Sequence, residues 1–170
     1  IGQDNVLDIV QPLTKANVGE DVYIASDTTI KAAESMVIGN HCAIDHYFYC
    51  SVRLKMKNHV HISTQVSIVG GKLSTIEIGN FVGICAGCRI IVHGSDVMSP
   101  GLTRTPVITL PGDDSPTGAV MRVEDFVFIG SNSVIFEGVT LGEGSVIGAG
   151  SIVKRSTKPW TVYAQGKAVR

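Results

Sequence analysis

Five histidines, at positions 41, 46, 59, 61 and 93, are the side chains in this 170-residue chain best suited to transferring protons at neutral pH. The ordinary pKa of imidazole lies close to neutrality, so histidine can remove the proton of an attacking hydroxyl or amine. Asp96 follows His93 closely and could orient a basic imidazole or hold an amine, although a solvated loop carboxylate is the simpler interpretation. The choice among the histidines depends on which of them the fold points outward.

Four cysteines, Cys42, Cys50, Cys85 and Cys88, carry thiols. Cys85 and Cys88 have the spacing of a redox or zinc pair, but one such pair without a second is a poor zinc site. Cys50 and Cys88 also fall in the inward columns of the repeat described next, and buried cysteine behaves as a small apolar residue. We therefore expect no nucleophilic or metal-binding cysteine.

A hydrophobic rhythm of six residues runs through most of the chain. A period of six does not keep to one face of a helix with 3.6 residues per turn, whereas strand residues two apart share a face. Small or β-branched residues, such as Cys42 and Val60, often lie two positions before the repeating apolar residue. The rhythm predicts an all-β parallel solenoid of about six coils, each with three short strands. The repeating column consists of Val18, Ile24, Ile30, Ile38, Ile44, Cys50, Met56, Ile62, Ile68, Ile78, Ile84, Ile90, Val123, Ile129, Ile135, Leu141, Ile147 and Val153.

Three interruptions of the rhythm all follow the third position of a coil. The intervals after Ile30, Ile68 and Ile90 are 8, 10 and 33 residues. The extra residues should therefore leave the solenoid at one edge, and insertions gathered on one face commonly build a binding surface. The longest insertion, residues 91–122, is predicted to be a functional excursion loop. We expect one domain over residues 1–170, with coils at 18–90 and 123–153 and a C-terminal tail at 154–170.

Composition and charge argue against several classes of protein. Hydrophobic residues make up 44% of the chain but aromatic residues only 6%, with 19 glycines, which favours short strands joined by tight turns. A net charge of −1 without a basic block argues against nucleic acid as a partner. No apolar run approaches the roughly 18 residues of a membrane span. The first residues lack the pattern of a signal peptide, so we expect a cytoplasmic protein.

Two stretches resemble a known family. Residues 127–153, which read VFIGSNSVIFEGVTLGEGSVIGAGSIV, resemble the C-terminal coils of the hexapeptide-repeat acyltransferases. Residues 60–79, together with the ending PWTVYA, resemble a narrower group, the sugar O- or N-acetyltransferases of surface-polysaccharide (O-antigen, lipopolysaccharide) pathways. The resemblance implies a left-handed parallel β-helix that forms a homotrimer. It also implies acetyl-CoA as co-substrate, no metal, and a hydroxyl or amine of a sugar, often nucleotide-linked, as the acceptor.

His61 is the histidine that pattern and resemblance both favour as the general base. It directly precedes the inward Ile62, so its side chain should project from a flat face, and it matches the histidine of the family's Val-His-Ile motif. A hydrogen-bonded histidine at a subunit interface is the alternative. His93, at the start of the excursion loop, is the second candidate, although the catalytic histidine of many relatives aligns with Val97 instead. His41 and His59 share a column on adjacent coils and should simply stack.

The resemblance also implies a binding path for acetyl-CoA along the C-terminal coils. Small residues that would let the pantetheine arm approach the backbone are Gly130, Ser131, Gly148 and Ala149. Cations that would meet the phosphates are Lys154, Arg155 and Lys167. The glycines are equally explained as turn residues, and the cations as charges that cap the end of the solenoid. The tail carries QGKAV where the family has Gly-x-Pro-Ala, which affects the phosphate contacts.

Two other functions remain open on sequence alone. His41 and His46 reproduce one ligand spacing of the zinc carbonic anhydrases built on the same fold, but the first coil has no histidine to complete that site. A β-helix scaffold without catalytic activity, whose loop docks another protein, is the other alternative.

Overall fold

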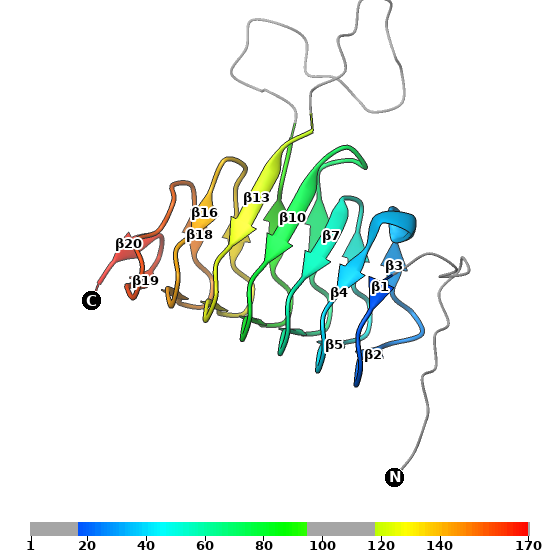
Figure 1. The fold of residues 1–170 in the computed structure, drawn as a ribbon. Coiled ribbons are helices and arrows are strands. Elements are labelled where there is room, and N and C mark those ends of the chain that lie inside the picture. The colour runs from blue at the N-terminus through cyan, green and yellow to red at the C-terminus, as the bar shows by residue number, and fades with distance from the viewer. Residues whose placement is uncertain (1–16, 95–117, 170) are drawn as a thin grey trace, which may run out of the picture.

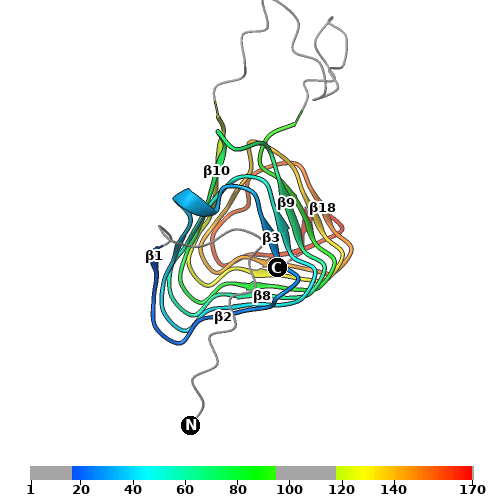
Figure 2. The same ribbon diagram turned by 90° about the vertical axis from the view of Figure 1, so that its right-hand side faces the viewer.

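The computed structural model describes residues 17–94 and 118–169, which wind into a triangular solenoid of parallel strands (Figure 1). Viewed along its axis, the three sheets form the sides of a prism, here called faces A, B and C (Figure 2). The fold is a left-handed β-helix of about six coils, as the six-residue rhythm and the resemblance predicted. Each coil pairs in parallel register with the next, so that neighbouring coils cover each other's apolar interior.

Face A contains β1 (Asn17–Val18), β4 (Val37–Ile38), β7 (Arg53–Met56), β10 (Thr75–Ile78), β13 (Val120–Val123) and β16 (Thr140–Leu141). Face B contains β2 (Tyr23–Ile24), β5 (Ala43–Ile44), β8 (His61–Ile62), β11 (Gly83–Ile84), β14 (Phe128–Ile129) and β17 (Val146–Ile147), and the C-terminal hairpin of β19 (Val162–Ala164) and β20 (Lys167–Ala168) extends it. Face C contains β3 (Thr29–Ile30), β6 (Tyr49–Cys50), β9 (Ser67–Val69), β12 (Arg89–Ile91), β15 (Val134–Ile135) and β18 (Ile152–Val153).

The core is the column of side chains that the rhythm predicted to point inward. Every member of the repeating column is buried except Val18, which is only half-buried on the first strand. Cys42, Cys50 and Cys88 are buried among these side chains, so the interpretation of the cysteines as core residues is confirmed for those three. Burial raises the pKa of the Cys50 thiol to about 12, which keeps it protonated and unreactive.

All three insertions leave the prism at the corner between faces C and A (Figure 2). The first contains the short helix η1 (Ala33–Ser35), the second spans residues 70–74, and the third begins after β12 and ends before β13. The middle of the third insertion, residues 95–117, lies outside the described residues. No helix in residues 17–94 or 118–169 is long enough to cross a membrane.

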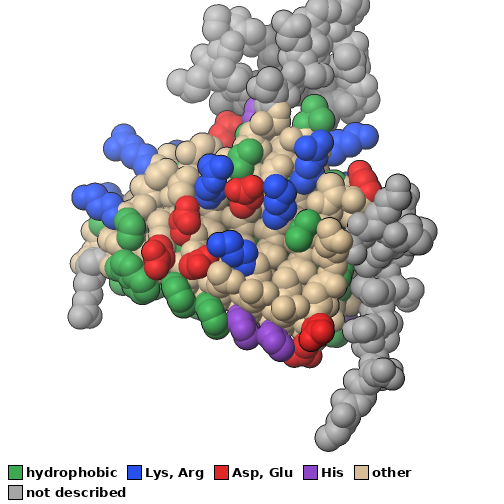
Figure 3. Space-filling view, viewed as in Figure 1, with side chains coloured by type: hydrophobic (Ala, Val, Ile, Leu, Met, Phe, Trp, Pro, Cys, Tyr) green, Lys and Arg blue, Asp and Glu red, His purple; other side chains and the backbone are tan. Residues whose placement is uncertain are grey.

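The corner between faces A and B carries a continuous stack of rings. His41 and His59 stack with centroids 4.9 Å apart, as predicted, and the stack continues through Phe81 and Phe126 to Trp160. Each of the five residues has a left-handed backbone with φ between 52° and 61°, a conformation that costs a non-glycine residue free energy. Figure 3 shows this row of hydrophobic and histidine side chains along the lower edge of face A.

A ladder of amides lies directly beside the stacked rings. The side-chain oxygens of Asn40, Asn58, Asn80 and Asp125 each accept a backbone N–H from the preceding coil, at 2.8–3.1 Å. The hydrogen bonds donated by the side chain and backbone of Asn80, with the nearby Lys57 ammonium, hold the pKa of Asp125 below its ordinary value. The same corner of successive coils is thus tied together twice, by rings and by hydrogen bonds.

Candidate active site

His61 projects from face B, as its place before the inward Ile62 predicted. It lies on β8, and 59% of its side chain is exposed. Its Nε2 atom is 3.0 Å from Oδ2 of Asp45, the residue that follows β5 on the preceding coil. When Nε2 carries the proton that it donates to Asp45, Nδ1 is left as the acceptor that a general base needs. The pair has the composition of an oriented catalytic histidine.

Small residues flank His61 on both sides. In the register of face B, His61 pairs with Ala43 on β5 and with Gly83 on β11. Larger outward side chains appear only one strand further, at Tyr23 and Phe128, which are both about half exposed. The imidazole is therefore accessible along the face in both directions.

The predicted pantetheine path lies at the corner between faces B and C. Gly130 and Gly148 directly follow β14 and β17 on successive coils, and Ser131 and Ala149 come next in the turns. A Cβ on Gly130 would press on the backbone of Ala149 at 2.5 Å, so coil stacking alone explains this glycine. Lys167 belongs to β20, which extends face B beyond β17 and β19, so it lies on the same side of the prism.

Lys154 and Arg155 occupy a different corner. They follow β18 at the corner between faces C and A, and the Nζ of Lys154 lies 5.4 Å from the centroid of the Phe136 ring. The residues predicted to bind acetyl-CoA are thus divided within one chain, with five on the face B side and these two at the opposite corner.

His93 lies at the root of the excursion loop, also at the corner between faces C and A. Its Nδ1 is 3.6 Å from Oε2 of Glu137, which accepts the backbone N–H of Gly94 at 2.8 Å. Asp96 lies outside the described residues. Face B is opposite this corner of the prism, so the structure does not bring His61 and His93 together within one chain (Figure 2).

His41 and His46 also pair with carboxylates, through Nδ1. His41 Nδ1 lies 3.1 Å from Asp21 at the corner between faces A and B, and His46 Nδ1 lies 3.0 Å from Asp27 at the corner between faces B and C. The strand β5 separates His41 from His46. Within residues 17–94 and 118–169, no three histidine, cysteine or acidic side chains are grouped as metal ligands.

Comparison with known proteins identifies the repeat. Residues 120–155 match the family described as the hexapeptide repeat of succinyl-transferase. A dTDP-4-amino-4,6-dideoxy-D-glucose acyltransferase of Escherichia coli is 28% identical over 151 residues, which cover 86% of this chain and 76% of the relative. Residues 120–155 of the chain therefore carry a hexapeptide repeat.

Other proteins similar to this chain bind coenzyme A or transfer acyl groups. A solved structure of AntD, an N-acyltransferase from Bacillus cereus in complex with dTDP and 3-hydroxybutyryl-CoA, is 28% identical, with a TM-score of 0.80 over 90% of this chain and 80% of that one. The structure of an AntD variant in complex with dTDP-4-amino-4,6-dideoxyglucose and coenzyme A is 27% identical in sequence to this chain, with a TM-score of 0.79. A probable macrolide acetyltransferase of Lysinibacillus sphaericus is 28% identical over 66% of each chain.

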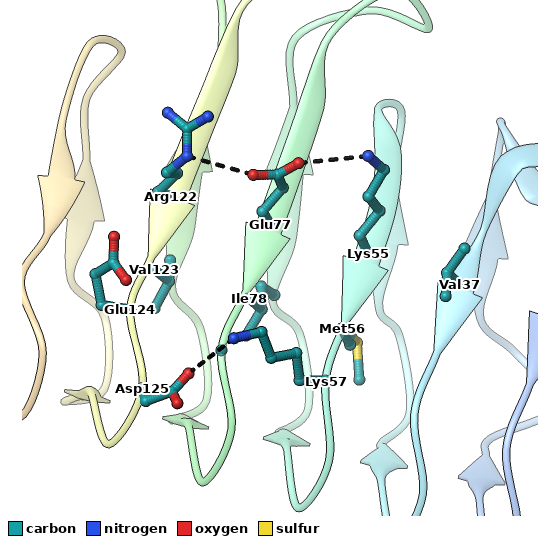
Figure 4. Close-up of a pocket in the computed structure, with 11 residues that line it drawn as sticks. Val37, Lys55, Met56, Lys57, Glu77, Ile78, Arg122, Val123, Glu124 and Asp125 are labelled. Carbon is teal, nitrogen blue, oxygen red and sulfur yellow. Dashed lines mark hydrogen bonds and ion pairs between the residues drawn. The ribbon is translucent and has the colours of Figure 1, made fainter.

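Sequence reasoning missed a cavity on face A. The cavity measures about 470 Å³ and extends across β4, β7, β10 and β13, and no histidine lines it (Figure 4). Glu77 lies 3.3 Å from both Lys55 Nζ and Arg122 Nε, and Lys57 lies 3.5 Å from Asp125. Because these exposed charges neutralise one another, the cavity offers less for an anionic ligand than its three cations suggest.

Sequence reasoning also missed Asp45, the partner of His61. It lies 16 residues before His61, in a turn with no motif of its own. When the coils are aligned by their inward residues, Ile44 pairs with Ile62 and Asp45 therefore with Ser63, two residues after His61. This alignment would have placed Asp45 within reach of the His61 imidazole.

Proposed function

We propose that this protein transfers an acetyl group from acetyl-CoA to an amine of a nucleotide-linked sugar. The observation that carries the proposal is the pair of His61 and Asp45 on the open part of face B, in a protein whose relatives acylate such sugars. The relatives' 4-amino sugars favour an amine over a hydroxyl as the acceptor. Acetyl is the expected acyl group, in contrast to the 3-hydroxybutyryl group bound by AntD.

The reaction requires one proton transfer and one exchange of bonds. Nδ1 of His61 accepts a proton from the amine as its nitrogen attacks the thioester carbonyl. A bond forms between that nitrogen and the carbonyl carbon, the bond between carbon and sulfur breaks, and the proton passes to the departing thiolate to give coenzyme A. Asp45 keeps the imidazole oriented and stabilises its charged form, while backbone N–H groups stabilise the oxyanion.

Acetyl-CoA lies along the corner between faces B and C in this proposal. From β8, which carries His61, to β20, which carries Lys167, there are five steps between neighbouring strands. At about 4.8 Å per step, the path is about 24 Å long, on the scale of an extended pantetheine arm with its diphosphate. Lys167 would meet the phosphates, and Gly130, Ser131, Gly148 and Ala149 would line the arm.

The site is completed by a second copy of the chain in a homotrimer. His93, Lys154 and Arg155 belong to the side of the prism opposite His61, so in one chain they cannot serve the same reaction centre. A neighbouring subunit would supply them, with Asp96 binding the sugar amine, His93 as the second candidate base, and the two cations near the phosphates. The homotrimer accounts for all the predicted residues with a single site.

The test is release of thiol from acetyl-CoA in the presence of dTDP-4-amino sugars, by the full chain and by His61→Ala and His93→Ala. We expect the general base to account for at least about a hundredfold in kcat. His61→Ala should therefore lose that much, with a smaller loss for His93→Ala. Full activity of His61→Ala would show that His61 is not the base.

A further inference from the structure

The root of the excursion loop is held between two neighbouring segments of the solenoid. A Cβ on Gly70, in the second insertion, would lie 2.7 Å from the backbone nitrogen of His93, so this insertion packs directly against the residue. On the following coil, Oε2 of Glu137 accepts the backbone N–H of Gly94 at 2.8 Å. The charged side chains of these two segments are Lys72 and Glu137. The backbone of His93 is therefore fixed from both sides.

The carboxylate of Glu137 also faces the imidazole. Its Oε2 atom lies 3.6 Å from Nδ1 of His93, so one oxygen holds both the side chain and the backbone N–H of the next residue. Of the histidines that pair with carboxylates in the described part of the chain, His93 is the least exposed, at 30% against 51–59% for His41, His46 and His61. A proton on Nδ1, facing Glu137, leaves Nε2 as a proton acceptor. The geometry is that of a second oriented base.

An amine acceptor has to lose two protons in the proposed reaction. Alkyl amines, with pKa values of about 8–10, are ammonium ions at neutral pH, and an ammonium nitrogen has no free electron pair with which to attack. The proton that His61 passes to the thiolate is the second one, because it leaves as the nitrogen attacks. The first proton must leave beforehand, so the reaction needs a second base.

We propose that Glu137 positions His93 to remove this first proton. The inference rests on the proposed function, because it requires an amine acceptor and a homotrimer in which His93 of one copy serves the same site as His61 of the next. One N–H bond of the ammonium breaks, its electron pair stays on nitrogen, and Nε2 of His93 binds the proton. The exposed part of the imidazole then releases the proton to water. Glu137 touches no substrate and acts through His93.

The experiment measures kcat and KM of the full chain at pH 7 and pH 9, by thiol release from acetyl-CoA with one dTDP-4-amino sugar. The variants are His93→Ala, Glu137→Gln and the two combined, with His61→Ala alongside. Glu137→Gln keeps a side-chain oxygen for the N–H of Gly94 and removes only the charge. The matched control is Glu143→Gln, which alters an exposed carboxylate of the next coil. His93→Asn serves if the alanine variant does not fold.

The expected losses separate a positioning role from a structural one. Glu137→Gln should lower kcat at pH 7 by about two- to fivefold, the size expected of a partly exposed ion pair, and leave KM unchanged. The combined variant should lose no more than His93→Ala alone, because Glu137 acts through that imidazole. At pH 9 the solution itself supplies neutral amine, so the losses of His93→Ala and Glu137→Gln should shrink, whereas the loss of His61→Ala should persist.

Two negative outcomes are distinguishable. If the natural chain is active but Glu137→Gln costs further activity in the His93→Ala background, or the losses stay the same at pH 9, the role of Glu137 and His93 is wrong and the proposed function stands. If the natural chain releases no thiol from acetyl-CoA at either pH, the proposed function fails and the inference fails with it.

Discussion

The two corners that flank face B are built on opposite plans. At the corner between faces A and B, rings on four successive coils stack beside a ladder of amide and carboxylate side chains, and the Trp160 ring joins the stack across the coil of Gly144. On the last complete coil at the corner between faces B and C, the exposed residues Ala149 and Gly150 are small and leave the backbone accessible. Turns of the same repeat thus hold successive coils together at one corner and leave the backbone accessible to a ligand at the other. The difference shows that a solenoid can separate stability from function by corner rather than by coil.

Glycine at the left-handed turn position should matter far more at the first corner than at the second. Gly144 has φ +63°, and its outward side is filled by the Trp160 ring, whereas Gly150 has φ +68° with nothing within 4 Å. Gly144→Ala should lower the free energy of unfolding by about 2–4 kcal/mol, because it combines strain with overpacking. Gly150→Ala should cost about 1 kcal/mol. Urea denaturation followed by circular dichroism measures both, and equal losses would contradict the contrast between the corners.

Loss of the carboxylate beside His61 should affect activity and not stability. Asp45→Asn keeps the shape of the side chain but removes the charge that stabilises a protonated His61, so kcat should fall roughly 10- to 100-fold. The loss should fall on kcat and leave KM unchanged, which a merely structural role would not produce. Asp27→Asn is the matched control, because it alters an equivalent pair with His46 at the same corner. An unchanged kcat for Asp45→Asn would exclude a positioning role.

Removal of a ring from the middle of the stack should weaken only the first corner. Phe81 stacks on His59 at 4.6 Å and on Phe126 at 5.4 Å between centroids. Phe81→Ala should lower the free energy of unfolding by about 1–2 kcal/mol. Phenylalanine and alanine are both strained in the left-handed backbone of this position, so the change in stability measures the contribution of the ring. Phe128→Ala, at a similar exposure on face B, should cost less. The reverse order in thermal denaturation would refute the stack as a stabilising element.

The smallest expected effect concerns acid stability at the same corner. The folded pKa of Asp125 is depressed, so its contribution to stability is present above the unfolded pKa, about 3.9, and is lost as pH falls through the lower folded value. Asp125→Asn continues the ladder with the residue type found at Asn58 and Asn80, but removes this titration. Urea midpoints measured from pH 5 to pH 2 should decline less steeply for the variant, and parallel curves would rule out the linkage.

The inward columns were predictable because a six-residue period is a property of the sequence alone. The stacking of His41 on His59 was also predictable, because no insertion interrupts the six-residue rhythm between them. The contacts of Phe81 with Phe126, and of His61 with Asp45, were not foreseen. Phe126 lies one coil beyond Phe81, but across the excursion loop, so the two are far apart in sequence and no fixed spacing links them. The contact of His61 with Asp45 could have been found by aligning the two coils in sequence, because no insertion separates them, whereas the contact of Phe81 with Phe126 across the excursion loop could not.

Trp160 reaches across the coil of Gly144 to close the ring stack, and it is the only tryptophan in the chain. Its indole is therefore an intrinsic fluorophore at the C-terminal end of the stack of rings. A change in emission before the loss of circular dichroism would report fraying of the C-terminal hairpin alone. Emission and ellipticity that change together would mean that the solenoid unfolds from end to end as one unit.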